Sequence, residues 1–174
     1  MKWLNHQIVT GFIVYAATDD ALFVASSIVG AVLPDRVEGS PPKESKAYWA
    51  WRKRHRTWSH YPILYLTLIA ILIFVKQYFN NEPTISLICE VGIYVMIGAL
   101  LHIAEDGVCG RVPIFKPTSK HGIKLFTVGS IGEYAFVAFT IFICFFSRFG
   151  DFERVLDILS NNFNQILNMV INKI

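Results

Sequence analysis

The chain has 174 residues and a net charge of +3, with 53% hydrophobic and only 17% charged residues. Soluble domains carry about 25% charged residues, so this composition excludes an ordinary soluble domain and indicates a membrane protein. The length leaves room for one domain without a large separate catalytic module, and three cysteines without a Cys-x-x-Cys pair exclude a disulfide framework and a thiolate zinc site.

Two short apolar stretches follow the N-terminus. Residues 8–15 and 21–33 are 8 and 13 residues long, or about 12 and 20 Å as helix, which is too short to cross a hydrocarbon core of about 30 Å. They form either one interrupted span or a short helical hairpin, and the hairpin would keep His6 and Asp35 on the same side. Pro34 ends the second stretch, so Asp35 lies directly after it. There Asp35 is either a capping or turn residue or a ligand.

Three further apolar stretches are candidate membrane spans, at residues 61–79, 85–104 and 125–146. The second contains Glu90 and the third contains Glu133. A carboxylate in lipid needs a partner, so Glu133 is a candidate acceptor for the ring nitrogen of a ligand histidine.

The segments between the spans are basic. Residues 34–60 contain seven lysines and arginines against three acidic residues, and residues 107–124 contain four lysines and arginines in what we expect to be an irregular loop. The positive-inside rule places both segments in the cytoplasm, so we do not expect nucleic acid to be the partner of these cations. His121, in the second segment, is either solvent-facing or an additional ligand.

The C-terminal residues 148–174 differ from the rest. Their apolar residues recur at helical spacing, with asparagine, glutamine and aspartate on the other side, so we expect an amphipathic helix. Such a helix can bind a protein partner, a second copy of the chain or a membrane surface. We therefore divide the chain into a membrane-embedded domain, residues 1–147, and this helix.

A pair of ionisable residues marks the end of the second candidate span. His102 and Asp106 are four residues apart, so in a helix they project from one face, with Glu105 close to the same face. Burying such groups in lipid costs at least about 2.5 kcal/mol each, so they must face protein, water or a metal. The pair is either a hydrogen-bonded couple or part of a clamp for a divalent cation.

A second polar group precedes residue 61. His55 and His60 flank Arg56 and Ser59, and this combination suits a site that handles a phosphate, because the guanidinium donates hydrogen bonds to its oxygens. A chain that crosses at 61–79 and returns at 85–104 brings His102 and Asp106 back to this side.

These residues resemble a known family, the YdjM-like, LexA-regulated inner-membrane proteins described as metal-dependent hydrolases. The resemblance runs from about His6 to Glu133 and rests on short motifs in a fixed order: His6, Leu33-Pro34-Asp35, His55-Arg56-x-x-Ser59-His60, Gly98-x-x-x-His102-x-x-x-Asp106, Val112-Pro113, Pro117 and Thr127-x-Gly129-Ser130-x-x-Glu133. This chain departs from the family pattern at Val37, Thr57 and Tyr61, where the family usually has aspartate, glycine and serine.

The resemblance implies a multi-pass protein of the bacterial inner membrane with a metal site near the membrane surface. The His-x-x-x-Asp element is similar to that of zinc-dependent phospholipase C and P1-type nucleases.

Together these observations predict an all-α polytopic membrane protein with the N-terminal hairpin or interrupted span, about three further spans and the C-terminal amphipathic helix. We expect a divalent metal, zinc before manganese or magnesium, with the ligands His6, Asp35, His60, His102 and Asp106. Arg56, His55 and Glu105 are the candidate catalytic residues.

The predicted function is hydrolysis of a phosphoester such as a phospholipid headgroup at the cytoplasmic face, with membrane lipids as partners and a homo-oligomer or protein partner through the C-terminal helix. The alternative is a non-catalytic membrane adaptor or assembly protein with a structural metal or a hydrogen-bonded cluster. A metal transporter is less favoured, because Glu90 and Glu133 are its sole mid-membrane candidates.

Overall fold

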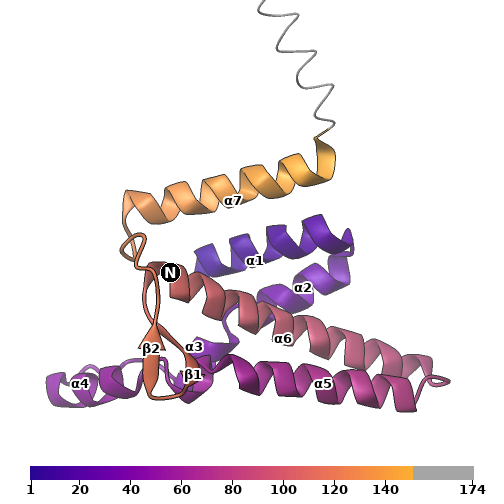
Figure 1. The fold of residues 1–174 in the computed structure, drawn as a ribbon, viewed down its shortest axis with the longest axis horizontal. Coiled ribbons are helices and arrows are strands. Elements are labelled where there is room, and N and C mark those ends of the chain that lie inside the picture. Colours follow the sequence, from indigo (N-terminus) through magenta and orange to yellow (C-terminus); the bar gives the residue numbers. More distant parts are fainter. Residues whose placement is uncertain (151–174) are drawn as a thin grey trace, which may run out of the picture.

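The computed structural model describes residues 1–150, and most of the expected amphipathic helix at 148–174 lies outside the described residues. Within them the protein is mostly helical. Five helices have roughly aligned axes (Figure 1): α1 (Trp3–Thr18), α2 (Ala21–Gly30), α5 (Pro62–Tyr78), α6 (Pro83–Cys109) and α7 (Ile131–Phe149). Successive helices of this group are antiparallel, so the connections between them lie at two opposite ends.

One of these ends carries the N-terminus and the remaining elements, and we call it the loop end (Figure 1). It contains α3 (Leu33–Glu38), α4 (Ser45–Arg54), the 3-10 turn η1 (Trp58–His60) and the strands β1 (Val112–Lys116) and β2 (Ser119–His121). The two basic segments therefore lie at the same end, and Lys120 Nζ donates a hydrogen bond to the backbone oxygen of His55 at 2.5 Å.

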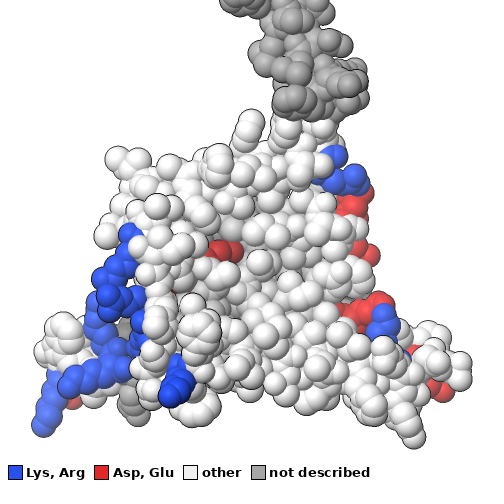
Figure 2. Space-filling model, viewed as in Figure 1, with Lys and Arg blue, Asp and Glu red and all other residues white. Residues whose placement is uncertain are grey.

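Two of the helices are long and apolar enough to cross a membrane. They are α6, with 27 residues, and α7, with 19, while α5 is apolar but shorter, with 17 residues. The charged side chains visible in Figure 2 lie mainly at the two ends of the helices, with lysine and arginine concentrated at the loop end. The band between the ends is almost without charge, as expected for a surface in contact with acyl chains.

A two-residue turn separates α1 from α2. Asp19 ends α1 in the left-handed conformation (φ 56°), and the carboxylate of Asp20 accepts hydrogen bonds from the backbone N–H groups of Leu22 and Phe23 at 2.8 and 3.1 Å. Asp20 is thus the N-cap of α2. Asp19 forms an ion pair with Arg148 near the end of α7, which links the turn to that helix.

Close contact between α2 and α6 depends on two glycines. A Cβ atom at Gly30 would lie 1.9 Å from the backbone oxygen of Val95, and one at Gly98 would lie 2.0 Å from the backbone oxygen of Ser27. No larger residue fits at either position without moving a helix, which is typical of small-residue contacts between membrane helices. This contact fixes the position of Ala31, just after α2, relative to His102 on α6.

The loop end differs from the sequence prediction in two respects. Residues 107–124, expected to be irregular, contain an antiparallel hairpin in which Val112 pairs with His121 and Lys116 with Ser119. Their prolines suggested a loop, but the β-branched and aromatic residues of β1 favour a strand, and the register is irregular between Pro113 and Lys116. Pro34 lies in the first turn of α3, where a proline is well tolerated, instead of simply ending the preceding helix.

Candidate metal centre

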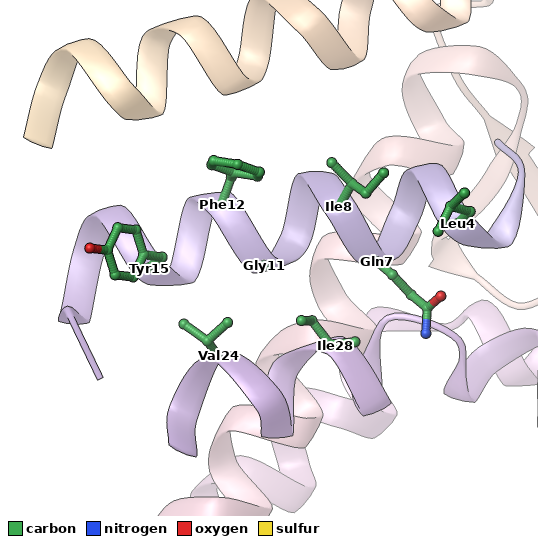
Figure 3. Close-up of a pocket in the computed structure, with 8 residues that line it drawn as sticks. All are labelled: Leu4, Gln7, Ile8, Gly11, Phe12, Tyr15, Val24 and Ile28. Atoms are coloured by element: carbon green, nitrogen blue, oxygen red, sulfur yellow. The ribbon is translucent and has the colours of Figure 1, made fainter. Parts of the chain in front are cut away.

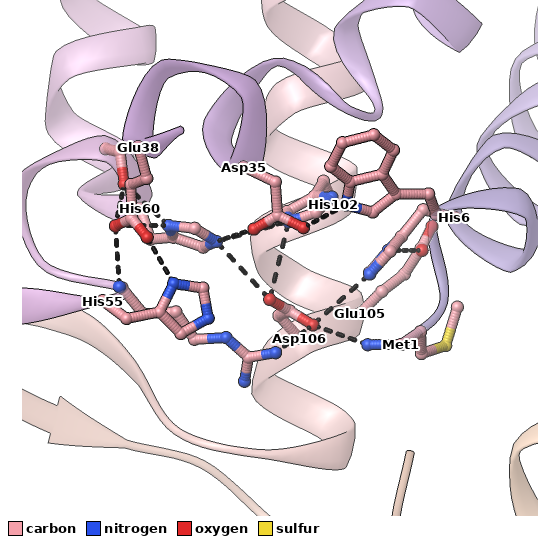
Figure 4. Close-up of polar contacts among 12 residues, drawn as sticks. Met1, His6, Asp35, Glu38, His55, His60, His102, Glu105 and Asp106 are labelled. Carbon is pink, nitrogen blue, oxygen red and sulfur yellow. Dashed lines mark hydrogen bonds and ion pairs between the residues drawn. The ribbon is translucent and has the colours of Figure 1, made fainter. Parts of the chain in front are cut away.

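Four side chains from three elements converge at the loop end (Figure 4). Asp35 comes from α3, His60 from η1, and His102 and Asp106 from consecutive turns of α6. Each offers one ligand atom, and these four atoms all lie within 4.8 Å of one another. The i, i+4 spacing of the α6 pair therefore has the consequence expected from the sequence, because both side chains point to the same place.

Five distances among the four donor atoms are close to those around a small tetrahedral ion. His60 Nε2 lies 3.3 Å from His102 Nε2, 3.4 Å from Asp35 Oδ1 and 3.5 Å from Asp106 Oδ2. His102 Nε2 lies 3.7 Å from Asp35 Oδ1 and 3.5 Å from Asp106 Oδ2. A tetrahedral zinc ion with bonds of about 2.0–2.1 Å places its ligands about 3.3–3.4 Å apart, so the observed spacing matches closely.

Two of the four donor atoms are buried without a hydrogen-bond partner among the described residues. They are Asp35 Oδ1 and Asp106 Oδ2, the carboxylate oxygens that face the two imidazoles. A buried carboxylate oxygen without a donor is costly, and such atoms in a folded protein call for an explanation such as an ion. The unpartnered oxygens therefore indicate a divalent cation independently of the distances.

Both histidines are oriented by their other ring nitrogen. His102 Nδ1 lies 2.6 Å from the backbone oxygen of Ala31, and His60 Nδ1 lies 2.9 Å from Ser59 Oγ and 3.5 Å from Glu38 Oε1. A proton on Nδ1 that is donated to an oxygen leaves the lone pair of Nε2 free. This is the usual arrangement of metal-bound histidines, which hydrogen-bond to a carbonyl or carboxylate behind the ring.

Glu38 is a site residue that the sequence analysis did not identify. Its carboxylate lies behind His60, accepts a hydrogen bond from the backbone N–H of Arg56 at 2.7 Å, and contacts the hydroxyl of Ser59 and Nδ1 of His55. The available signal was its position three residues after Asp35, about one helical turn. Glu38 therefore holds together the segment that carries His60.

The second oxygen of Asp106 is surrounded by positive groups. Asp106 Oδ1 accepts hydrogen bonds from the Met1 amine at 2.8 Å and from Arg56 Nη2 at 2.9 Å, and it lies 3.3 Å from His6 Nε2. The two oxygens of Asp106 thus have different surroundings. Oδ1 is fixed by these three groups, which leaves Oδ2 directed at His60 and His102.

His6 lies beside the four donors and is not one of them. Its ring stacks on that of His102 with 3.9 Å between centroids, and its Nδ1 lies 2.5 Å from Glu105 Oε2. Glu105 also accepts a hydrogen bond from Thr10 at 3.2 Å. The sequence placed His6 among the ligands and Glu105 among the catalytic residues. In the structure these two residues form a pair, and the His6 ring packs on the face of the His102 ring.

The two candidate catalytic residues of the 55–60 segment have different surroundings. His55 stacks on Trp51, with 4.4 Å between ring centroids, and both line a cavity of ≈ 330 Å³ together with Glu38 and Trp58. Arg56 has a positive φ of 57°, and its Nε is buried with no hydrogen-bond partner among the described residues. Backbone strain of this kind is concentrated at functional sites.

The charges of the site are set by mutual contacts. Burial raises the pKa of Asp35, but the nearby imidazoles of His60 and His102 outweigh burial and lower the pKa to about 2. Burial lowers the pKa of His60, but the nearby carboxylates of Asp106, Asp35 and Glu38 raise it to about 10. Without a metal, a proton on His60 therefore compensates part of the negative charge.

Glu133, Glu90 and His121 make contacts away from the four donors. Glu133 accepts hydrogen bonds from the backbone N–H groups of Lys2 and Gly129 and from the Asn5 amide, so it ties the N-terminus to α7 and does not contact a ligand histidine. Glu90 pairs with Lys76 at 2.5 Å. His121 Nε2 lies 2.9 Å from Ser119 Oγ, within the hairpin.

The comparisons with known proteins identify the family of the chain. The model of the family described as YdjM inner membrane protein matches residues 1–166, which extends beyond the motifs and includes much of the C-terminal segment that they did not cover. No match was found among curated proteins or among solved structures. The chain therefore belongs to the YdjM inner membrane protein family, and it is a membrane protein with a group of aspartate and histidine side chains that could hold a metal ion.

Proposed function

We propose that the protein is a membrane-bound, metal-dependent phosphoesterase whose metal ligands are Asp35, His60, His102 and Asp106. The observation that carries the proposal is the convergence of these four donors within 4.8 Å of one another, two of which are buried carboxylate oxygens without another partner. A divalent ion held there would lower the pKa of a water molecule and polarise a phosphoryl oxygen. The mixture of imidazole and carboxylate suits zinc, with manganese or magnesium as the alternatives.

The chain's own residues supply the remaining parts of such a site. Arg56 is anchored to Asp106 through Nη2, and its buried Nε–H is free to donate to an oxygen of a bound phosphoester. Its charge would stabilise the negative charge that develops on that group. His55, on the wall of the cavity, is placed to exchange protons with solvent, and Glu38 links it to His60.

We further propose that the loop end is cytoplasmic and that the chain crosses the membrane several times, with α1 and α2 as a hairpin from the loop end. The support is the concentration of lysine and arginine at that end. Single cysteines at Ser40 and Asn81, which are both exposed and lie at opposite ends, can be labelled with a membrane-impermeant maleimide. The Asn81→Cys variant should react from the periplasm and the Ser40→Cys variant should not; the reverse result would contradict this orientation.

One observation favours a second candidate, a structural metal centre in a non-catalytic adaptor. The protein itself supplies four donors, which is the number that closes a structural zinc site, whereas catalytic zinc sites usually keep one position for water. Asp35 is the most exposed of the four, with 17% of its side chain accessible against 1% or less for the others. A phosphoesterase would therefore admit water on the side of Asp35.

The test measures metal content and phosphoester turnover on protein purified in detergent without chelator. His102→Ala and Asp106→Ala should each lose the bound metal, while His121→Ala, a histidine outside the cluster, should keep it. Arg56→Lys should keep the metal and lose turnover by about 10²-fold, since lysine retains the charge but lacks the planar fork of donors.

The outcomes separate the candidates. Equal metal content in the wild type and both alanine variants would refute a metal centre. Metal that is lost in both variants, together with a wild type that cleaves neither a soluble phosphodiester nor phospholipid, would support the structural centre instead.

A further inference from the structure

An apolar groove runs along the outside of the protein between α1 and α2 (Figure 3). Its volume is ≈ 590 Å³, and its walls are formed by Leu4, Ile8, Phe12 and Tyr15 on α1 and by Val24 and Ile28 on α2. The α1 wall from Leu4 to Tyr15 extends for about 16 Å at 1.5 Å per residue. In a membrane protein such a groove faces acyl chains, because it lies between two helices of the uncharged band.

One end of the groove leads to the metal centre. Trp3, the residue before Leu4, donates a hydrogen bond from Nε1 to Asp35 Oδ2 at 2.7 Å. The guanidinium of Arg36 lies over the Trp3 ring, 4.9 Å from its centroid. On the other wall, α2 ends at Gly30, and the next residue, Ala31, accepts the hydrogen bond of His102. Both walls of the groove thus end at residues that contact a metal ligand.

We propose that this groove binds an acyl chain of a phospholipid whose phosphate lies at the loop end, beside Arg36 and Asp35. The proposal rests on the proposed function, and it names the substrate as an anionic lipid with a long acyl chain. The apolar walls match the chain, and the exposed cation of Arg36 at the mouth matches the phosphate. Gln7 is the one polar residue among those that line the groove in the described part of the chain.

Gly11 determines the depth of the groove. It lies on the α1 wall, and a Cβ atom there would lie 3.2 Å from Ile28 Cδ1 on the opposite wall. A leucine side chain at this position would therefore extend across the groove and occupy the space of the acyl chain. Gly92 on α6 provides the matched control, because a Cβ atom there would meet the flexible side chain of Leu72 of α5 at 3.0 Å, away from the groove.

Photo-crosslinking tests occupancy without relying on catalysis. The full chain is reconstituted in vesicles that contain phosphatidylglycerol with a diazirine in its acyl chain, and the adducts are mapped by mass spectrometry. We expect adducts on peptides covering residues 4–15 and 24–28 in the wild type and in Gly92→Leu. In Gly11→Leu they should fall by about tenfold, because the loss of even two methylene contacts has an effect of that size.

Other occupants would give different results. Adducts that appear only after removal of residues 151–174 would show that this segment covers the groove, and adducts that appear only at low protein-to-lipid ratio would show that a second copy covers it. Either result would overturn the proposal, as would equal labelling of the wild type and Gly11→Leu.

A turnover comparison separates this proposal from the proposed function. If both hold, Gly11→Leu should lower cleavage of vesicle phospholipid by about tenfold relative to cleavage of a soluble phosphodiester, which has no acyl chain to place in the groove. Adducts in the groove of a wild type that cleaves neither compound would support lipid binding and refute hydrolysis. Cleavage of the lipid by a wild type without adducts in the groove would support hydrolysis and refute the groove as its binding site.

Discussion

Substitution of Gly98 by alanine should lower the affinity of the site for zinc, although Gly98 is not one of the four candidate ligands. Gly98 lies on α6 one turn before His102, at the closest approach to α2. The added Cβ would lie 2.0 Å from the backbone oxygen of Ser27, whereas real Cβ contacts are essentially never below 3.0 Å, so α2 must move by about 1 Å or more. The obstacle is backbone, so no side-chain rotation relieves it.

The displacement is large enough to break the contact that orients His102. The distance of 2.6 Å between His102 Nδ1 and the Ala31 oxygen would increase toward about 3.6 Å, beyond the range of a hydrogen bond. Loss of such a contact behind a metal-bound histidine typically lowers metal affinity by about 10- to 100-fold.

Competition with a chromogenic zinc chelator measures this loss, and circular dichroism confirms that the helices remain. Gly92→Ala is the matched control on the same helix, because its Cβ would meet only the movable end of Leu72. Gly98→Ala with wild-type zinc affinity and retained helicity would show that the α2–α6 contact does not set the position of the site, and would refute this reasoning.

Three other predictions address separate parts of the molecule. Glu38→Gln keeps the size of the side chain but removes the carboxylate behind His60, so zinc affinity should fall by about 10- to 100-fold; chelator competition showing no loss would contradict the role assigned to Glu38. Because contacts with Asp106, Asp35 and Glu38 raise the pKa of His60 to about 10 in the metal-free protein, the protonated ring stabilises that form at low pH, and this stabilisation is lost as the pH rises through about 10. A metal must displace the proton, so zinc affinity should rise by about tenfold per pH unit between about pH 7 and 9, and a flat profile would contradict this. Asp19→Asn removes one charge of the exposed ion pair with Arg148 but still tolerates the left-handed conformation of this residue, so it should lower the free energy of unfolding by no more than about 1 kcal/mol with no change in metal content, as measured by denaturant titration and metal analysis.

The sequence predicted the helical architecture and most of the polar cluster because both depend on local spacing. The i, i+4 spacing of His102 and Asp106 fixes their relative position on any helix. The return of the chain through α5 and α6 brings His102 and Asp106 back to the end where His60 lies. The hairpin alternative placed Asp35 at this end as well, and the family resemblance, confirmed by the match over residues 1–166, includes Asp35 in its motifs.

The roles within the cluster could not be predicted in the same way, because they depend on contacts between helices. His6 was expected to be a ligand. Its ring stacks on His102 and its Nε2 lies 3.3 Å from Asp106 Oδ1, outside the group of four donors, so its role as a ligand stays a prediction. This placement depends on how α1 lies against α6, which no local pattern specifies. The contact of Gly30 and Gly98 is equally nonlocal, since each glycine alone is an unremarkable helix residue.

Asp35 links these observations into one argument about function. Its Oδ1 faces the two imidazoles, and its Oδ2 accepts the hydrogen bond of Trp3, so the same carboxylate contacts the metal centre on one side and the mouth of the groove on the other. A purely structural centre gains nothing from placing its most exposed ligand at the end of an apolar groove. A phosphoesterase that acts on lipid requires this arrangement, because the phosphate must reach the metal while the acyl chain remains among apolar side chains. Under the proposed function, the exposed side of Asp35 is therefore where the phosphate of a lipid substrate would approach the metal.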